Sequence, residues 1–342
     1  MFATQFKKAI QVAINAQVPL WAWGQAGIGK SAIIRTVTAA LKREHIDVRP
    51  TQMDPVDMGI PFVRDGVCYR AIPNWLPKDG NTLIAVEELP DAPMSVQCAL
   101  YQLVLERRLG DYSLPDGAYI CATGNRAKDG GNFNQPPAPL MNRFLHLELE
   151  SGYDSWLEWA VGGYSNDEVE IIAPRPITPH IRPEIRAFFG FRKDLLVQQP
   201  NKNDYAFCTP RSVEFLSRIL DQQPSDDVVG EMIRGTIGSG TGYEFLGFLK
   251  TWQSLPQLSA IIRDPESVPV PKDLSANYAT AIYLSSNWDK QNSKPLCTYV
   301  QRLSPEYGCL FLKDVCKRDK AAPTSRPIIE MISRPEYSQL MF

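Results

Sequence analysis

The sequence lacks two features that would place the protein in a membrane or on nucleic acid: a long apolar run and a strong charge of one sign. No hydrophobic stretch reaches the roughly 18 residues that a membrane-spanning helix needs. The 342 residues carry 36 Lys and Arg against 38 Asp and Glu, which gives a formal net charge of −2. This balance provides no overall attraction to nucleic acid, although a local basic groove is compatible with it. We therefore expect a cytoplasmic protein without a membrane partner, and the charge argues against nucleic acid as a partner.

Disulfide and zinc patterns are also missing. The seven cysteines are an odd number, widely spaced and without a C-x-x-C pair, which indicates free thiols in a reducing compartment. The histidines, His45, His146 and His180, lie far apart, so we expect them in the core or on the surface and not as zinc ligands. The chain is long enough for a sizeable core and two domains.

A glycine-rich stretch near the N-terminus has the spacing of a phosphate-binding loop, G-x-x-x-x-G-K-[ST]. Glycines let the backbone turn its N–H groups inward, where a side chain would block a phosphate. Lys30 can reach the β- and γ-phosphates, and the Ser31 hydroxyl can bind Mg²⁺. A buried strand at 19–23 and a helix at 31–37 favour a nucleotide site over a glycine turn that binds nothing. The expected binding residues are Gly24, Gln25, Ala26, Gly27, Ile28, Gly29, Lys30 and Ser31.

A second informative stretch, 82–88, has apolar residues that lead into two acids, Glu87 and Glu88. A buried parallel strand delivers carboxylates to the nucleotide edge of a sheet in this way, which is the Walker B pattern. Glu87 would hold Mg²⁺, and Glu88 would orient and deprotonate the attacking water. Alone, the pattern is more often a solvated strand end. Its place downstream of a phosphate loop favours the catalytic interpretation.

Strands alternate with helices from residue 18 to residue 149, which predicts a doubly wound parallel α/β domain. Residues 2–14 carry apolar side chains at helical spacing, which is typical of an amphipathic helix packed on that domain. Asp65 and Gly66 between apolar pairs suggest a small hairpin. Residues 235–242 are glycine-rich but lack a following lysine, so we expect a turn between helices and not a second phosphate loop.

Two further polar residues stand next to predicted element ends. Asn125 follows the strand 118–123 and can hydrogen-bond a water near the γ-phosphate; the alternative is an Asx-turn residue. Thr209 is suited to cap a helix that has Pro210 at its first position. Arg211 would then lie in the first turn, able to touch phosphate. An ordinary capped helix is the alternative.

These motifs together resemble one family closely, the AAA+ ATPases of the MoxR-like group. The resemblance covers about residues 1–220 and is strongest at 20–35, 82–126 and 139–145. It implies a P-loop NTPase core with a doubly wound parallel sheet, followed by an α-helical lid and a helical C-terminal region. It also implies ATP and Mg²⁺ as ligands.

The resemblance assigns roles to three polar residues. Asn125 matches sensor 1, and Arg211 matches sensor 2. Arg143, in an L-x-x-R-F segment before the last core strand, matches the arginine finger, which projects into the neighbouring subunit's site and neutralises charge on the γ-phosphate. A surface salt bridge is the alternative for Arg143. The resemblance thus implies a ring, most often a hexamer, with ATP between subunits.

The expected domains are an AAA+ nucleotide-binding core at 1–150, an α-helical lid at 151–263 and a helical C-terminal appendage at 274–342. A Pro-rich stretch near 162–182 departs from the family pattern, and we expect an insertion there. Glu87 also departs from it, because the family usually has Asp at this position. Mg²⁺ demands strict octahedral geometry, so the longer side chain would reach it through a bridging water or slow the turnover.

For the function, the resemblance implies chaperone-like remodelling of a client protein, often one with a von Willebrand factor A domain. Two alternatives stay open. One is an ATP-binding scaffold with little turnover, which the substitution of Glu87 for Asp would explain. The other is an AAA+ loader or translocase that acts on nucleic acid, against which the near-neutral charge argues.

Overall fold

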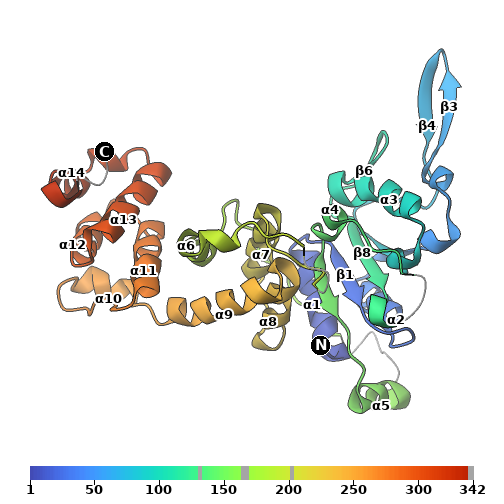
Figure 1. The fold of residues 1–342 in the computed structure, drawn as a ribbon, viewed down its shortest axis with the longest axis horizontal. Coiled ribbons are helices and arrows are strands. Elements are labelled where there is room, and N and C mark those ends of the chain that lie inside the picture. The colour runs from blue at the N-terminus through green and yellow to red at the C-terminus, as the bar shows by residue number, and fades with distance from the viewer. Residues whose placement is uncertain (130–132, 163–168, 201–203, 338–342) are drawn as a thin grey trace. The chain divides into compact units, whose positions relative to one another are not determined.

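The structure, a computed structural model, describes residues 1–129, 133–162, 169–200 and 204–337 (Figure 1). The chain forms two compact units, each with its own hydrophobic core. The first unit contains Met1–Pro179 and Val197–Gly242, and the second contains His180–Leu196 and Tyr243–Phe342.

The first unit consists of a parallel sheet, small hairpins and surrounding helices. Its strands are β1 (Leu20–Trp23), β2 (Glu44–Val48), β3 (Ile60–Arg64), β4 (Val67–Ala71), β5 (Thr82–Val86), β6 (Arg108–Leu109), β7 (Tyr112–Ser113), β8 (Tyr119–Gly124) and β9 (Leu145–Glu148). Its helices are α1 (Ala3–Asn15), α2 (Lys30–Ala40), α3 (Met94–Glu106), α4 (Ala138–Met141), α5 (Tyr153–Gly162), α7 (Pro210–Asp221) and α8 (Asp226–Ile237).

In the described residues, the main sheet has five strands in the order β2-β5-β8-β1-β9, and every neighbouring pair is parallel. Parallel neighbours require crossover connections, and α2 and α3 lie in such connections. The carboxyl ends of β1, β5 and β8 therefore meet at one edge of the sheet. The predicted fold class, a doubly wound parallel sheet with a helical C-terminal region, is confirmed.

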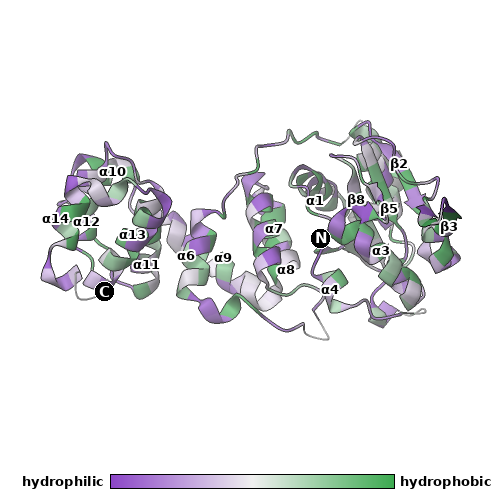
Figure 2. Cartoon of the chain, turned by 90° about the horizontal axis from the view of Figure 1, so that it is seen from above, coloured by the Kyte–Doolittle hydropathy of each residue, from purple (hydrophilic) through white to green (hydrophobic). Residues whose placement is uncertain are grey.

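Separate hydrophobic clusters cover the two faces of this sheet. In β1, Leu20 and Ala22 belong to a cluster that includes residues of α1 and α2, whereas Trp21 and Trp23 belong to one that includes residues of α3 and α4. Burial on both faces explains why the strands read as continuous apolar runs. The helices show hydrophobic and hydrophilic residues on different sides, as α7 does in Figure 2. They expose the hydrophilic side to water.

Several local predictions are confirmed. The N-terminal apolar pattern forms α1, with Phe6 and Ile10 fully buried. Strands β3 and β4 pair as a hairpin whose turn residues, Asp65 and Gly66, have φ of 53° and 76°. This hairpin projects from the body of the first unit (Figure 1), and each of its strand residues is exposed. Between α8 and the next helix, Gly238 forms the predicted turn with φ of 85°.

The second unit is helical and has a core of its own. Its helices include α6 (Pro183–Phe191), most of α9 (Ser239–Gln253), α10 (Leu258–Arg263), α11 (Leu274–Ser286), α12 (Ser293–Val300), α13 (Pro305–Arg318) and α14 (Arg326–Ile332). Segment 180–196 belongs to this unit, so the unit boundary differs from the predicted ones at 150 and 263. The lid and the appendage stay predictions. In the predicted Pro-rich insertion, 163–168 lies outside the described residues and 169–182 forms no helix or strand.

Two expectations concern the whole chain. Each cysteine is a free thiol; Cys121 and Cys208 are among the buried ones, whereas Cys68 and Cys98 are exposed. Among the described helices, none combines the length and the apolar character that crossing a bilayer takes.

Candidate functional site

The predicted phosphate loop turns from β1 into α2 at the carboxyl edge of the sheet. Its glycines have φ of 156° at Gly24, 77° at Gly27 and 96° at Gly29, which other residues rarely adopt. A Cβ at Gly24 would overlap the side chain of Ile28 and lie 2.8 Å from the carbonyl oxygen of Leu149. A Cβ at Gly27 would meet nothing within 4 Å. The loop is therefore closely packed at Gly24 and free of side chains at Gly27, so that its backbone N–H groups can contact an anion.

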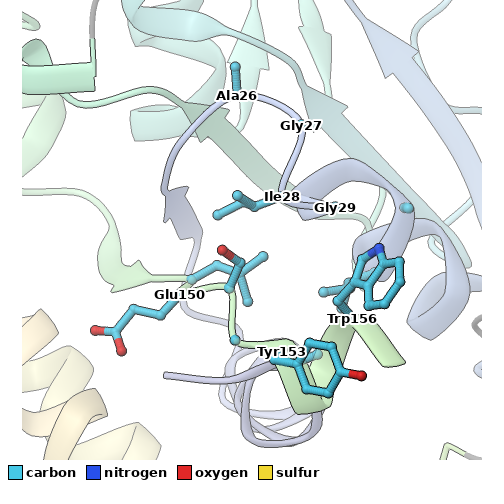
Figure 3. Close-up of a pocket in the computed structure, with 13 residues that line it drawn as sticks. Ala26, Gly27, Ile28, Gly29, Glu150, Tyr153 and Trp156 are labelled. Carbon is cyan, nitrogen blue, oxygen red and sulfur yellow. The ribbon is translucent and has the colours of Figure 1, made fainter. Parts of the chain in front are cut away.

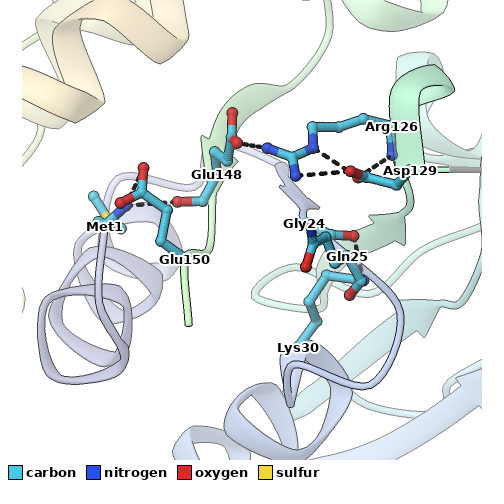
Figure 4. Close-up of polar contacts among 8 residues, drawn as sticks. All are labelled: Met1, Gly24, Gln25, Lys30, Arg126, Asp129, Glu148 and Glu150. Carbon is cyan, nitrogen blue, oxygen red and sulfur yellow. Dashed lines mark hydrogen bonds and ion pairs between the residues drawn. The ribbon is translucent and has the colours of Figure 1, made fainter. Parts of the chain in front are cut away.

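Lys30 is the first residue of α2 and is buried, with a relative exposure of 9%. Its Nζ donates hydrogen bonds to the carbonyl oxygens of Gly24 at 2.8 Å and Gln25 at 2.9 Å, residues that Figure 4 draws beside it. A third bond reaches Oδ1 of Asn125 at 3.0 Å. Burial lowers the pKa of Lys30, and the Glu87 carboxylate opposes that shift. Neutral oxygens thus hold the ammonium group within the loop, from where it can turn to a phosphate.

Two hydroxyl groups converge on one oxygen of Glu87. Ser31 Oγ donates to Oε2 at 2.7 Å, and Thr123 Oγ1 in β8 donates to the same oxygen at 2.6 Å. Glu87 is 6% exposed, and among the described residues its buried Oε1 has no hydrogen-bond partner. An orphaned, buried carboxylate oxygen beside a hydroxyl suits a hard cation that takes oxygen ligands. Ser31 and Glu87 therefore fit the predicted magnesium site.

Glu88 is exposed to solvent directly after this buried carboxylate. It holds a left-handed backbone conformation, with φ of 54° and ψ of 37°. Its N–H donates to Thr123 Oγ1 at 3.0 Å. The N–H of Asp91 donates to the Glu88 carbonyl oxygen at 3.0 Å. Burial raises the pKa of Asp91, and the Glu88 carboxylate raises it further. Glu88 thus lies where solvent can reach it, as a base that accepts a proton from water must.

Thr123 is a site residue that the sequence motifs did not predict. It is 1% exposed and contacts both predicted acids, through the Glu87 carboxylate and the Glu88 amide. The signal available in the sequence was its place two residues before Asn125, at the end of the same strand.

Arg126 was also missed, and it forms an ion-pair cluster at the sheet edge. Its guanidinium donates to Asp129 at 2.6 and 2.8 Å and pairs with Glu148 at the end of β9. Figure 4 shows the guanidinium between these two carboxylates, near Gly24. The hydrogen bonds from Arg126 lower the pKa of Asp129. Because β1 lies between β8 and β9, this cluster joins the strand ends on both sides of the phosphate loop.

Arg143 lies inside its own chain, with a relative exposure of 7%. Its Nη1 donates to the Tyr101 hydroxyl at 3.1 Å and to the carbonyl oxygen of Pro139. The guanidinium carbon lies 4.5 Å from the centroid of the Tyr101 ring, a cation–π contact. Arg143 has no carboxylate partner among the described residues, and its Nε is unpaired. Within the described residues, Arg143 therefore forms no surface salt bridge, and none of its hydrogen bonds involves the phosphate loop.

Arg211 lies in the first turn of α7 and is exposed. The predicted cap is confirmed, because Thr209 Oγ1 accepts a hydrogen bond from the N–H of Ser212 at 3.2 Å. Burial lowers the pKa of Arg143, and the positive charge of Arg211 adds to that shift. Hydrogen bonds thus bring together four of the predicted site residues, Lys30, Ser31, Glu87 and Asn125. Glu88 is connected to them through Thr123. Arg143 and Arg211 take no part in this hydrogen-bond network.

Stacked aromatic rings lie beneath the phosphate loop. Trp23, the residue before Gly24, stacks on Tyr205 with centroids 4.0 Å apart and on Trp21 at 4.8 Å. Its Nε1 donates to Nδ1 of His146 at 2.9 Å, so the His146 proton sits on Nε2, 2.8 Å from the carbonyl oxygen of Met141. The stack connects the start of the loop to the segment that precedes α7.

A pocket of about 700 Å³ opens next to the loop. Figure 3 shows residues 26–29 on one side of it and the rings of Tyr153 and Trp156, from α5, on another. The two rings are 5.9 Å apart, and their residues are 71% and 54% exposed. Leu149 and Ala3 add apolar surface to the lining. A flat, apolar ligand group beside the phosphate loop would fit between these walls.

Comparisons with known proteins give little help with this site. No family model matches the sequence, and no curated protein matches it. Among solved structures, the chain is similar to a candidate ATPase from Cytophaga hutchinsonii, with 17% sequence identity. That similarity covers 67% of this chain and 74% of the other, with a TM-score of 0.42. A likeness at this level carries no conclusion about function.

His146 gives the stability of the fold a predictable pH dependence. Burial lowers its pKa from 6.5 to about 4. Between these values the unfolded chain binds a proton that the folded protein rejects, so the free energy of unfolding falls as the pH drops from about 6.5 to about 4. The loss from this residue is about 3 kcal/mol.

His146→Gln keeps an acceptor for Trp23 and a donor for Met141 but has no titrating ring. Urea unfolding of both proteins between pH 4 and pH 7 checks the prediction, because the other titrating groups contribute equally to each. We expect the wild-type curve to fall more steeply than that of the variant. Parallel curves would show that the ring is already charged or is exposed.

Proposed function

We propose that this chain is an ATP-hydrolysing protein of the AAA+, MoxR-like type that works as a ring and remodels a protein partner. The observation that carries the proposal is the convergence of Lys30, Ser31, Glu87 and Asn125 at the carboxyl edge of a parallel sheet, linked by hydrogen bonds. In open α/β sheets, ligands bind at this edge.

The phosphate groups of ATP would bind at the start of α2. The N–H groups of the loop and the dipole of the helix favour an anion there. Lys30 would exchange its three oxygen partners for phosphate oxygens, because an ammonium donor forms stronger hydrogen bonds with charged acceptors than with carbonyl groups. The base would occupy the neighbouring pocket, against Tyr153 and Trp156, whose rings offer the stacking surface that a purine prefers.

The two acids would have different roles, Glu87 in binding the cation and Glu88 as the general base. Ser31 and Glu87 would hold Mg²⁺, which neutralises negative charge that develops on the phosphates. The orphaned Oε1 of Glu87 supports this role despite the extra methylene relative to Asp. Glu88, exposed beside it, would take a proton from the attacking water. Once its hydrogen bond to Lys30 is broken, Asn125 would help to orient the attacking water.

The ring would complete the site from a neighbouring subunit. Arg143 would leave Tyr101 and enter the adjoining site, and Arg211 would touch phosphate from its own chain. A hexamer and a client with a von Willebrand factor A domain are what the family resemblance implies. The exposed apolar side chains of the β3–β4 hairpin, Ile60, Phe62, Val63, Val67 and Tyr69, offer a surface for a protein partner.

A second candidate is an ATP-binding scaffold with little turnover. The burial of Arg143 against Tyr101 favours it, because an arginine held there cannot act in a neighbouring site. An assay of phosphate release by the assembled protein separates the two candidates.

Substitutions at Lys30 and Glu88 test binding and hydrolysis separately. Lys30→Met should weaken the binding of a fluorescent ATP analogue about 10- to 100-fold, because a hydrogen bond to a charged group contributes about 1.5–3 kcal/mol. Glu88→Gln should bind as tightly as the wild type but release phosphate about 10²–10⁴ times more slowly, the usual contribution of a general base. Lys78→Met, at an exposed lysine, is the control. Unchanged binding by Lys30→Met would refute the nucleotide site.

A mixing experiment tests whether Arg143 acts across a subunit interface. Arg143→Ala and Glu88→Gln should each be inactive alone in phosphate release. In a mixed ring, an Arg143→Ala subunit that keeps Glu88 can receive Arg143 from a Glu88→Gln neighbour. An equal mixture should therefore regain up to about a quarter of the wild-type rate, the share of such interfaces in a randomly mixed ring. Failure to regain activity in rings shown to be mixed would contradict the shared site.

A further inference from the structure

Thr123 contacts both acids of the site with a single hydroxyl group. Its Oγ1 donates to Oε2 of Glu87 at 2.6 Å and accepts the N–H of Glu88 at 3.0 Å. The backbone pairing of β5 with β8 ends at Val86 and Ala122. The Thr123 hydroxyl therefore continues the contact between the two strands one residue further, through a side chain. The residue is 1% exposed, so water cannot replace the hydroxyl easily.

The first bond selects which oxygen of Glu87 stays free. Oε2 accepts two hydroxyl groups, from Ser31 and Thr123, while the buried Oε1 has no partner among the described residues. An unpaired, buried carboxylate oxygen costs free energy unless a cation or a donor satisfies it. The Thr123 bond keeps the carboxylate turned so that Oε1 is the atom left for a ligand.

The second bond fixes the backbone from which Glu88 projects. Glu88 has φ of 54°, a strained conformation for a non-glycine residue that persists only where neighbours hold it. Its N–H is held by Thr123, and its carbonyl oxygen accepts the N–H of Asp91 at 3.0 Å. Loss of the hydroxyl would release one of these two restraints and leave the Glu88 amide unpaired.

We infer that Thr123 is a positioning residue that sets the direction of both acids at once, turning Glu87 toward the cation and Glu88 toward the attacking water. The inference rests on the proposed function and names a residue that neither the phosphate loop nor the acid pair includes. Serine can form both hydrogen bonds, whereas valine, which has nearly the same shape, can form neither.

The alternative is a hydroxyl that only stabilises the fold. A merely structural Thr123 would lower stability on substitution, with the same effect on nucleotide binding with and without magnesium. If Thr123 positions the acids, its substitution should change the Mg²⁺ requirement and the rate of phosphate release but not nucleotide binding without Mg²⁺. The reason is that Glu87 and Glu88 act only when the cation and the water are present.

The experiment compares Thr123→Val and Thr123→Ser with a control, Thr82→Val. Thr82 is a fully buried threonine at the opposite end of β5 from the acids, and its hydroxyl bonds to Glu44 at 3.2 Å. Three quantities are measured on the full chain: the urea unfolding midpoint, the affinity for a fluorescent ATP analogue with EDTA and in a Mg²⁺ titration, and the rate of phosphate release.

We expect Thr123→Val to bind the analogue in EDTA within about twofold of the wild type. It should require about 10- to 100-fold more Mg²⁺ and release phosphate about 10- to 100-fold more slowly, the usual effect of removing an outer-shell partner. Thr123→Ser should recover most of both losses. Thr82→Val should match the wild type in nucleotide binding and turnover, whatever it does to the unfolding midpoint.

Equal Mg²⁺ requirements for Thr123→Val and Thr82→Val would overturn the inference, and so would a Thr123→Ser variant no better than Thr123→Val. If circular dichroism shows that Thr123→Val is unfolded, Thr123→Ala is used instead, because it removes the same hydroxyl without adding a methyl group. Absence of nucleotide binding by the wild type would instead overturn the proposed function, and this inference with it. If the wild type binds but does not hydrolyse, the Mg²⁺ titration alone decides.

Discussion

One carboxylate oxygen, Oε2 of Glu87, accepts hydrogen bonds from two hydroxyl groups that belong to different elements, Ser31 of α2 and Thr123 of β8. The site depends on this arrangement, because it brings the phosphate loop, the acid pair and the end of the central strand to one point. Parallel strand order makes it possible: β1 and β5 both flank β8, so their carboxyl ends open at one edge. Antiparallel neighbours would send these loops to opposite edges.

Polar groups around this point are satisfied in a way that leaves room for a ligand. Lys30 is held by carbonyl and amide oxygens and not by a carboxylate, so a phosphate does not have to break an ion pair to bind it. Arg126, by contrast, is committed to Asp129 and Glu148 and joins the strand ends beside the loop. Ion pairs thus occupy one part of the edge, whereas one ammonium group and one orphaned carboxylate oxygen remain for a ligand.

Arg143 raises the energetic question of how a shared site would form. Its contact with Tyr101 combines a hydrogen bond, a cation–π interaction and burial of the guanidinium. Such contacts contribute about 0.5–2 kcal/mol each. Subunit association would have to offset their loss, so release of Arg143 on ring assembly would couple oligomerisation to hydrolysis.

Local patterns were sufficient to predict the strands of the sheet, the phosphate loop and the acid pair, because each rests on periodicity or on spacing within a few residues. Lys30, Ser31, Glu87 and Asn125 could be placed at one edge for the same reason. Contacts between distant segments could not be predicted in this way: the Thr123 bonds, the stack of Trp23 on Tyr205, and the wall of the pocket at Tyr153 and Trp156. The grouping of 180–196 with 243–342 likewise depends on long-range packing that leaves no local signal.

In the proposed function, the loop before α2 holds a nucleoside triphosphate through Lys30, with a cation between Ser31 and Glu87. A crystal structure of the protein with Mg²⁺ and a non-hydrolysable ATP analogue tests it most directly. We expect Nζ of Lys30 to leave the carbonyl oxygens of Gly24 and Gln25 for the phosphates, and the cation to lie beside Ser31 Oγ on the side of Oε1 of Glu87. An analogue bound elsewhere, with Lys30 still bonded to both carbonyl oxygens, would contradict it.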